Sequence, residues 1–222
     1  MPSHTAAVED YLKAVHILEE EGASGSVATQ AVADRLGVSA ASATNMLKKL
    51  AVMGLVEHAP YKGANLTPAG RKVALEVIRH HRLLETYLAE ALGVPWDRVH
   101  DEAEVLEHVL SEDLEDRIAA LLGDPKADPH GHPIPGKDGS MPQASAQRLW
   151  TVPDGASVTI ERVSDDQAAL LRFLAKVGIR PGSVVTVIER GPIGGPLFVR
   201  INGGPPDVQA LSKDLAEAVW VA

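Results

Sequence analysis

The sequence predicts a mainly α-helical protein with a small β domain at its C-terminal end, and three observations support this fold class. Apolar residues recur at helical spacing from about residue 6 to residue 122. Short runs of β-branched residues, separated by Gly and Pro, replace that pattern from Val152 onward. Near the N-terminus, two helical segments joined at a glycine precede a hairpin pattern, which is the order of a winged helix-turn-helix.

The N-terminal region contains the signals that begin and end each element. Apolar side chains from Val8 to Leu18 share one helical face, Ser39 can cap a later helix, and Gly54 ends it. A turn between Pro60 and Gly63 separates two short extended runs. The predicted elements are helices over 6–21, 30–36 and 40–53 and strands at 55–58 and 64–67.

The middle and C-terminal regions divide in the same way. Thr67 and Pro68 start a long helix through about residue 92, and a further helix is predicted over 99–122. The stretch from Asp124 to Gln147 is rich in Pro, Gly and Asp, which is typical of an ordered loop followed by a flexible linker. The β runs at 157–160, 184–188 and 197–201, with a short helix near 166–177, predict a small β-barrel.

Composition excludes several classes of protein. The chain has 222 residues, of which 45% are hydrophobic and 23% charged, as expected for a folded protein. The absence of cysteine excludes disulfides, zinc–thiolate and iron–sulfur sites and a cysteine nucleophile. The acidic start lacks an apolar stretch, so no signal peptide is predicted. No apolar run is long enough to span a membrane, so no membrane contact is predicted and we expect a cytoplasmic protein.

Charge is distributed unevenly along the chain. Residues 27–75 carry six basic and two acidic residues, a net charge of +4, whereas residues 76–140 carry six basic and fifteen acidic residues, a net charge of −9. This contrast favours a small polyanion-binding module next to a cation-binding module. Ordinary variation of a solvated surface is the alternative explanation.

The helix predicted over 40–53 is the expected DNA-reading element, because one helix fits the major groove. Its polar side chains can contact base edges or phosphates, and the hairpin tip can contact the backbone. A few lysines cannot hold DNA alone at physiological salt, so a homodimer on two operator half-sites is expected. The candidate DNA-binding residues are Ser39, Ser42, Thr44, Asn45, Lys48, Lys49 and Lys62.

Metal-binding side chains gather at helical spacing in the acidic region. On a helix over 99–122, four candidate ligands lie within about 100° of arc, and an earlier helix adds a pair at i, i+4. Oxygen and imidazole ligands without thiolate suit Mn(II) or Fe(II), although other divalent ions can enter such sites. The four ligands are His100, Glu104, Glu107 and His108, the pair is His81 and Glu85, and Asp10 and the run 128–132 offer further donors.

Two other functions fit parts of this pattern. A metal hydrolase would need an open coordination position and an acid–base partner, and the sequence contains no nucleophile motif. A winged-helix regulator that senses a small molecule would not need the ligands. Neither an enzyme nor a small organic substrate is therefore expected.

The sequence resembles the diphtheria toxin repressor family of iron- and manganese-dependent transcriptional regulators over essentially its whole length. The stretches that carry the resemblance are Glu9-Asp10-Tyr11-Leu12, the helix-turn-helix at 30–50, Leu66-Thr67-Pro68-Ala69-Gly70, His81-Arg82-Leu83-Leu84-Glu85, His100 to His108 and Ile134-Pro135-Gly136. The resemblance implies a repressor of metal-homeostasis genes with a winged-helix domain at 1–73, a helical dimerisation and metal domain at 74–140, a linker at 141–151 and an SH3-like (FeoA-like) domain at 152–222.

The resemblance also implies a first metal site. Iron-responsive members carry Met and Cys where this chain has Asp10 and Glu104, and this exchange of sulfur for oxygen favours Mn(II), with Fe(II) as the alternative. Short manganese regulators use a glutamate one turn after the aspartate to hold a second, adjacent ion, but that position is Lys13 here, and a cation cannot ligate. The implied site is Asp10, His81, Glu104, Glu107 and His108.

Longer family members have a separate second site in one of two forms. One form uses His81, Glu85 and His100 with two residues of the SH3-like domain, which here are Ser164 and Gln167 and leave the set incomplete. The other form is complete, and we favour it with His100 added. Its residues are Glu85, Asp128, His130 and Asp165.

The expected mechanism links the ion to DNA through the first helix. Asp10 lies on the element that packs against the DNA-reading unit, so neutralising the clustered carboxylates is expected to favour the DNA-binding form. Because ligation requires neutral His81 and His108, the metal response is expected to weaken as the pH falls toward ~6.

Overall fold

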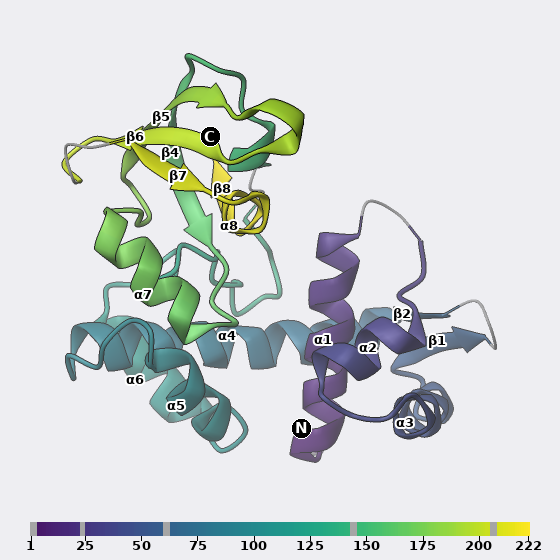
Figure 1. The fold of residues 1–222 in the computed structure, drawn as a ribbon. Coiled ribbons are helices and arrows are strands. Elements are labelled where there is room, and N and C mark those ends of the chain that lie inside the picture. Colours follow the sequence, from purple (N-terminus) through teal and green to yellow (C-terminus); the bar gives the residue numbers. More distant parts are fainter. Residues whose placement is uncertain (1–3, 23–24, 60–62, 143–145, 205–207) are drawn as a thin grey trace. The chain divides into compact units, whose positions relative to one another are not determined.

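A computed structural model describes residues 4–22, 25–59, 63–142, 146–204 and 208–222 (Figure 1). These residues form two compact units. The first unit comprises Met1–His80, Glu107–Val109 and Pro135–Ser140, and the second comprises His81–Leu106, Leu110–Ile134 and Met141–Ala222. The domain boundaries expected from the sequence stay predictions.

The first unit is a helix-turn-helix followed by a two-stranded hairpin, as the sequence predicts. Leu12 and Val15 of the first helix share one buried core with Val32, Leu47 and Leu50. The first helix therefore packs directly on the two helices that are predicted to read DNA. The elements are α1 (Ala6–Glu21), α2 (Thr29–Arg35), α3 (Ala40–Val52), β1 (Val56–Ala59), β2 (Gly63–Leu66) and the start of α4 (Pro68–Glu90).

Local hydrogen bonds fix where these helices begin. The hydroxyl of Ser39 accepts from the backbone N–H of Ser42 at the start of α3, and that of Thr67 accepts from Gly70 at the start of α4. A Cβ on Gly70 would lie 1.9 Å from the carbonyl oxygen of Leu55, so only glycine lets α4 approach the hairpin this closely.

The second unit contains the end of α4, the short helices that follow it, and the C-terminal sheet with further short helices. The strands form one six-stranded antiparallel sheet in the order β3-β8-β4-β5-β6-β7, and α7 accompanies it (Figure 1). The elements are α5 (Val99–Leu106), α6 (Glu112–Leu121), β3 (Gln147–Arg148), η1 (Leu149–Thr151), β4 (Ser157–Val163), α7 (Ala168–Val177), β5 (Val184–Arg190), η2 (Pro192–Gly194), β6 (Leu197–Ile201), β7 (Gln209–Leu211), α8 (Lys213–Glu217) and β8 (Val219–Val221).

The single helix predicted over 99–122 is wrong. Helix α5 ends at Leu106, and α6 begins at Glu112 after a turn. The hydroxyl of Ser111 accepts from the backbone N–H of Leu114 and caps the new helix, whose first turn is acidic. Glu107 and His108 therefore lie in the turn, and the expected single helical face with His100 and Glu104 is wrong.

The predicted fold class is confirmed: helical N-terminal elements with a small hairpin precede an antiparallel β domain. The β domain has its own aliphatic core, which includes Leu149, Ile160 and Leu174. Among the described residues, none of the helices is long and apolar enough to cross a membrane. The predicted DNA contact Lys62 lies outside the described residues.

Candidate metal centres

The first unit brings three of the predicted ligands together. One ligand atom from each of Asp10, Glu107 and His108 lies within 4.8 Å of the others. The Nε2 atom of His108 is 2.9 Å from Asp10 Oδ1 and 3.5 Å from Glu107 Oε1, while its Nδ1 atom is 2.6 Å from Glu9 Oε2. The turn after α5 thus presents an imidazole to the acidic start of α1, and we call these three residues the α1 cluster.

A lysine ammonium, that of Lys13, lies beside the α1 cluster. The ammonium of Lys13 lies 2.9 Å from Glu107 Oε1 and 2.7 Å from Oε2. Both side chains are buried, with 11% and 0% of their surfaces exposed. Lys13 follows Asp10 by one helical turn, so the residue that cannot ligate a metal ion instead neutralises a predicted ligand.

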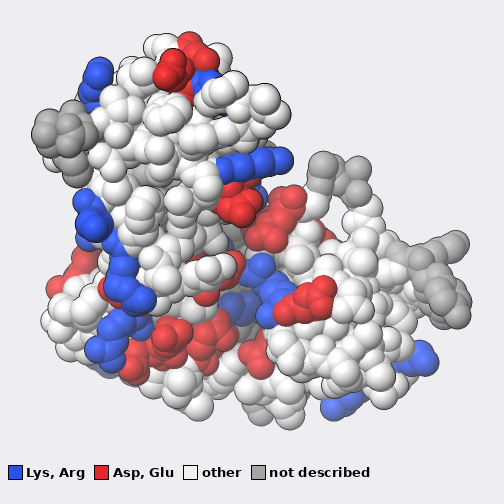
Figure 2. Space-filling view, in the orientation of Figure 1, with Lys and Arg blue, Asp and Glu red and all other residues white. Residues whose placement is uncertain are grey.

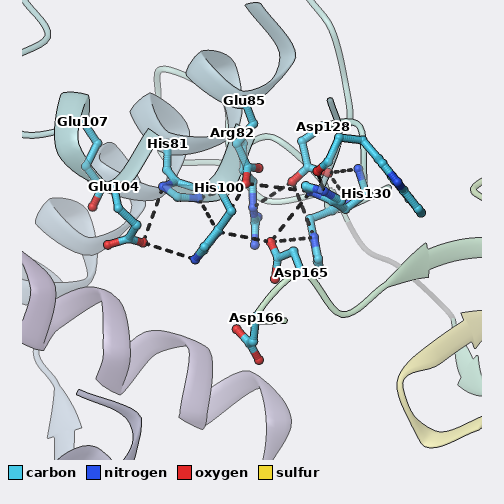
Figure 3. A network of polar contacts seen from close by, with 12 residues as sticks. His81, Arg82, Glu85, His100, Glu104, Glu107, Asp128, His130, Asp165 and Asp166 are labelled. Atoms are coloured by element: carbon cyan, nitrogen blue, oxygen red, sulfur yellow. Dashed lines mark hydrogen bonds and ion pairs between the residues drawn. The ribbon is translucent and has the colours of Figure 1, made fainter. Parts of the chain in front are cut away.

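The second unit holds a chain of histidines and carboxylates (Figure 3). One group consists of His81, His100 and Glu104, and their ligand atoms lie within 4.8 Å of one another. The Nε2 atom of His81 is 3.1 Å from His100 Nδ1 and 3.1 Å from Glu85 Oε1. Glu85 Oε1 also lies 3.3 Å from His100 Nδ1, so a fully buried carboxylate has an imidazole on each side.

A second group in this unit joins the loop after α6 to the residue Asp165, which follows β4. Its members, which we call the loop cluster, are Asp128, His130, His132 and Asp165. Among the described residues, no hydrogen-bond partner reaches three of their buried atoms, namely Asp128 Oδ2, His130 Nδ1 and His132 Nδ1. Buried polar atoms are normally paired, so these three atoms indicate a place for a bound cation.

Electrostatics in the second unit favour charged groups despite burial. Burial alone would lower the pKa of His130, but the neighbouring carboxylates of Glu85, Asp128 and Asp165 raise that pKa to about 9. Burial would likewise raise the pKa of Glu85, yet His81, His100 and His130 hold it well below its usual value. Without a metal ion, protons on the imidazoles therefore balance the carboxylates.

The predicted site residues are thus distributed over both units. Glu104 and His81 belong to the group in the second unit, and their participation in the first metal site stays a prediction from the resemblance. Of the second-site residues, Glu85, His100 and Asp165 form one group, and Asp128 and His130 form another with Asp165. Sequence reasoning did not select His132, although the alternation of His130 and His132 in one short loop was a visible signal.

The predicted DNA-reading side chains lie mostly on the surface of α3. Ser42, Asn45, Lys48 and Lys49 are exposed, whereas Thr44 is half-buried and its hydroxyl donates to the Ala40 carbonyl at 2.7 Å. The Ser39 side chain is exposed as well as capping α3. By contrast, Figure 2 shows acidic side chains over α5 and α6, a surface that is unsuited to a polyanion.

Comparison with known proteins finds three matching family profiles in chain order. The iron dependent repressor N-terminal DNA binding domain matches residues 4–64. The iron dependent repressor metal binding and dimerisation domain matches residues 67–136, and the FeoA domain matches residues 147–222.

Whole-length relatives agree with these profiles. The iron-dependent repressor IdeR of Mycobacterium leprae is 36% identical over 96% of this chain and 95% of its own length. The diphtheria toxin repressor of Corynebacterium diphtheriae is 33% identical over 96% of this chain and 95% of its own length. A solved manganese-dependent transcriptional repressor in complex with manganese is 43% identical, with a TM-score of 0.90 over 97% of this chain and 99% of that structure.

Proposed function

Because the chain belongs to the iron-dependent repressor family, it is a metal-dependent DNA-binding transcriptional repressor rather than an enzyme, and we propose that Mn(II) is the ion it senses. The donor atoms of the α1 cluster are oxygens and an imidazole nitrogen, which suit Mn(II) and leave Fe(II) as the alternative. A solved relative that is 43% identical is a manganese-dependent repressor in complex with manganese, which supports the same choice. Other divalent ions are expected to substitute in vitro, and metal-homeostasis genes are the expected targets.

The α1 cluster is the first metal site in this proposal. His108 Nε2 already lies 2.9 Å from Asp10 Oδ1 and 3.5 Å from Glu107 Oε1, so little movement is needed for the three to converge on one centre. A divalent ion, when bound, supplies the positive charge that offsets the two carboxylates. A second ion is proposed in the second unit, where the sequence leads us to expect Glu85, His100, Asp128, His130 and Asp165 as its ligands.

Helix α1 connects the first site to the DNA-reading elements. One face of α1 carries Asp10 and Lys13, and another packs into the core of the helix-turn-helix. Further along, Glu19 accepts from the backbone N–H of Leu66 in β2 at 2.8 Å and pairs with Arg71 of α4 at 2.6 Å. A change in how α1 is held is therefore transmitted to the hairpin as well as to α3, and coupling of ~1–3 kcal/mol is typical of such linkage.

The proposed DNA contacts are the polar side chains of α3 with the hairpin. Ser39, Ser42, Thr44 and Asn45 would contact bases or phosphates, and Lys48, Lys49 and Lys62 would contact phosphates. Double-stranded operator DNA is thus the proposed partner, bound in the cytoplasm and without contact to a membrane.

A homodimer would present two such reading helices. Large apolar side chains are exposed on α5 and α6, with Val105 73%, Leu114 48% and Leu121 69% accessible. These helices lie within the stretch that matches the dimerisation domain. Burying these apolar side chains against a second copy accounts for their exposure in the single chain.

The observation that carries the proposal is the α1 cluster on a helix that shares a core with α3. Fluorescence anisotropy with promoter DNA of the protein's own target genes tests it, in Mn(II) and after removal of metal with EDTA. We expect Mn(II) to tighten binding about 5–150-fold and Asp10→Ala to remove this effect, whereas Asp101→Ala, an exposed carboxylate on α5, retains it. Equal binding after EDTA would favour a regulator that senses something other than metal.

Lys48 gives a separate test of the DNA interface. Lys48→Ala is expected to weaken binding to all DNA sequences alike and to reduce the slope of log K against log salt by about 1, because one phosphate contact is lost. Lys72→Ala, an exposed lysine on α4, serves as the matched control. An unchanged salt slope in Lys48→Ala would contradict its phosphate role.

A further inference from the structure

We propose that His132, and not His100, supplies the second imidazole of the second metal site, so that one divalent first-row ion is held by Asp128, His130, His132 and Asp165. This inference rests on the second ion of the proposed function and changes its ligand set. His132 replaces His100, and Glu85 is left out because its Oε1 atom already lies 3.1 Å from His81 Nε2 and 3.3 Å from His100 Nδ1. No ligand set expected from the sequence includes His132.

His130 and His132 lie on either side of Gly131, where the backbone of the loop comes close to the backbone of β4. Gly131 has φ +90, and a Cβ there would lie 2.0 Å from the carbonyl oxygen of Glu161 in β4. The carbonyl of His130 accepts from the backbone N–H of Val163 at 2.9 Å. The residue between the histidines therefore has to be glycine, and the loop is fixed against the strand that leads to Asp165.

Asp128 uses one carboxylate oxygen for the loop and leaves the other available. Its Oδ1 atom accepts from the backbone N–H groups of His130 at 2.8 Å and His132 at 3.0 Å. Its Oδ2 atom has no hydrogen-bond partner among the described residues. The same carboxylate thus orders the two histidines and presents beside them an oxygen that accepts no hydrogen bond from the described residues.

Both imidazoles present Nδ1 to this centre. His130, whose side chain is fully buried, contacts the carbonyl oxygen of Trp96 through Nε2 at 2.7 Å, so that nitrogen carries the proton and the neutral ring keeps its lone pair on Nδ1. His132 Nδ1 lies 3.5 Å from Asp128 Oδ2 and 3.6 Å from Asp165 Oδ2, and His130 Nδ1 lies 4.0 Å from Asp165 Oδ2. Donors placed about 2.1 Å from one ion are separated by roughly 3 to 4.3 Å, so these spacings fit a shared ion.

His100 is the competing imidazole, and its surroundings differ. Its Nδ1 atom lies 3.9 Å from Asp165 Oδ2, but the same atom is already 3.1 Å from His81 Nε2 and 3.3 Å from Glu85 Oε1. Bringing His100 to an ion at the loop would break these contacts. His132 has no comparable contact to lose, because its buried Nδ1 has no hydrogen-bond partner among the described residues.

Charge supports one divalent ion. The carboxylates of Asp128 and Asp165 contribute two negative charges, and Arg82 Nε, 3.8 Å from Asp128 Oδ2, contributes one positive charge. With neutral imidazoles on His130 and His132 the cluster stays negative, and a divalent ion offsets this charge. Two nitrogen donors also favour Co(II) or Zn(II) over Mn(II), so this site is expected to be less selective for Mn(II) than the α1 cluster.

The test uses the full-length protein with Asp10→Ala to silence the α1 cluster. Co(II) is titrated by calorimetry into this background and into matched versions that also carry His132→Ala or His100→Ala. We expect His132→Ala to weaken Co(II) binding about 30-fold or more, and His100→Ala to change it less than about threefold. Unchanged binding in His132→Ala, or an equal loss in His100→Ala, would overturn the proposal.

A second measurement does not depend on the folding of His132→Ala. Proton NMR of the Co(II)-loaded Asp10→Ala protein counts the ligated imidazoles from their shifted N–H signals. Two such signals are expected with His100 intact, and two again in His100→Ala. A loss of one signal in His100→Ala overturns the assignment, whereas Mn(II)-dependent operator binding by the unmodified protein separately reports whether the proposed function itself holds.

Discussion

The α1 cluster and the loop cluster contain the same kinds of ligand but balance their charge differently. In the α1 cluster, the Lys13 ammonium contacts both oxygens of the buried Glu107 carboxylate at 2.9 and 2.7 Å. In the loop cluster, a proton on His130 helps to balance the carboxylates, as the raised pKa of His130 indicates. A metal ion that binds the α1 cluster must overcome repulsion by the Lys13 ammonium, which stays in place. A metal ion that binds the loop cluster can instead displace the proton of His130. We therefore expect the two sites to respond differently to mutation and to pH.

The largest effect, on the free energy of unfolding, is expected from removing the Glu107 carboxylate that contacts the Lys13 ammonium. Glu107→Ala takes away a buried partner of Lys13, and breaking a buried ion pair typically costs about 3–5 kcal/mol. Urea unfolding in EDTA measures this cost. Glu104→Ala, whose side chain is 41% exposed, is the control and should cost less than about 1 kcal/mol. Similar losses for the two variants would contradict the charge balance inferred for the α1 cluster.

A smaller effect is expected from removing the ammonium itself. Lys13→Met eliminates a positive charge beside the proposed metal site, so Mn(II) affinity should rise on the order of tenfold, since like charges repel most strongly where water is excluded. Calorimetric titration compares it with Lys72→Met, an exposed lysine of the same unit. If both variants bind Mn(II) as the unmodified chain does, Lys13 does not set the affinity of this site.

The pH dependence of the loop cluster sharpens the comparison further. Because the carboxylates raise the pKa of His130 to about 9, its proton competes with metal throughout the neutral range. In the Asp10→Ala background, log K for Co(II) should rise by about one for each pH unit between pH 6 and 8. An imidazole of ordinary pKa would give a slope that flattens above about 6.5, and that outcome would contradict proton balance in this cluster.

Much of the fold could be predicted from the sequence because its signals are local. Apolar spacing and a capping serine located α1 and α3 to within about a residue, and Gly and Pro marked the hairpin and the β domain. The break between α5 and α6 was missed because the apolar and acidic pattern continues through it. Only the cap at Ser111 and the acidic turn after it signalled a new helix.

The metal ligands could be predicted only in part, because the sequence shows which side chains can bind a metal ion but not which of them lie together. Chemical type and helical spacing identify Asp10 or His130 as candidates, but which side chains share one centre depends on contacts between distant segments. The Lys13–Glu107 pair joins residues 94 positions apart, and the contact between His108 and Glu9 joins residues 99 positions apart. His132 was passed over because its role depends on the course of a loop that Gly131 and β4 fix together.

The most direct test of the central claim measures Mn(II) affinity of the unmodified chain with and without its operator DNA. Linkage requires that each ligand change the affinity of the other by the same factor. We predict that operator DNA tightens Mn(II) binding about 5–150-fold, equal to the factor by which Mn(II) tightens operator binding. The same Mn(II) affinity in the presence and absence of operator would contradict a metal site coupled to the DNA-reading helix through α1.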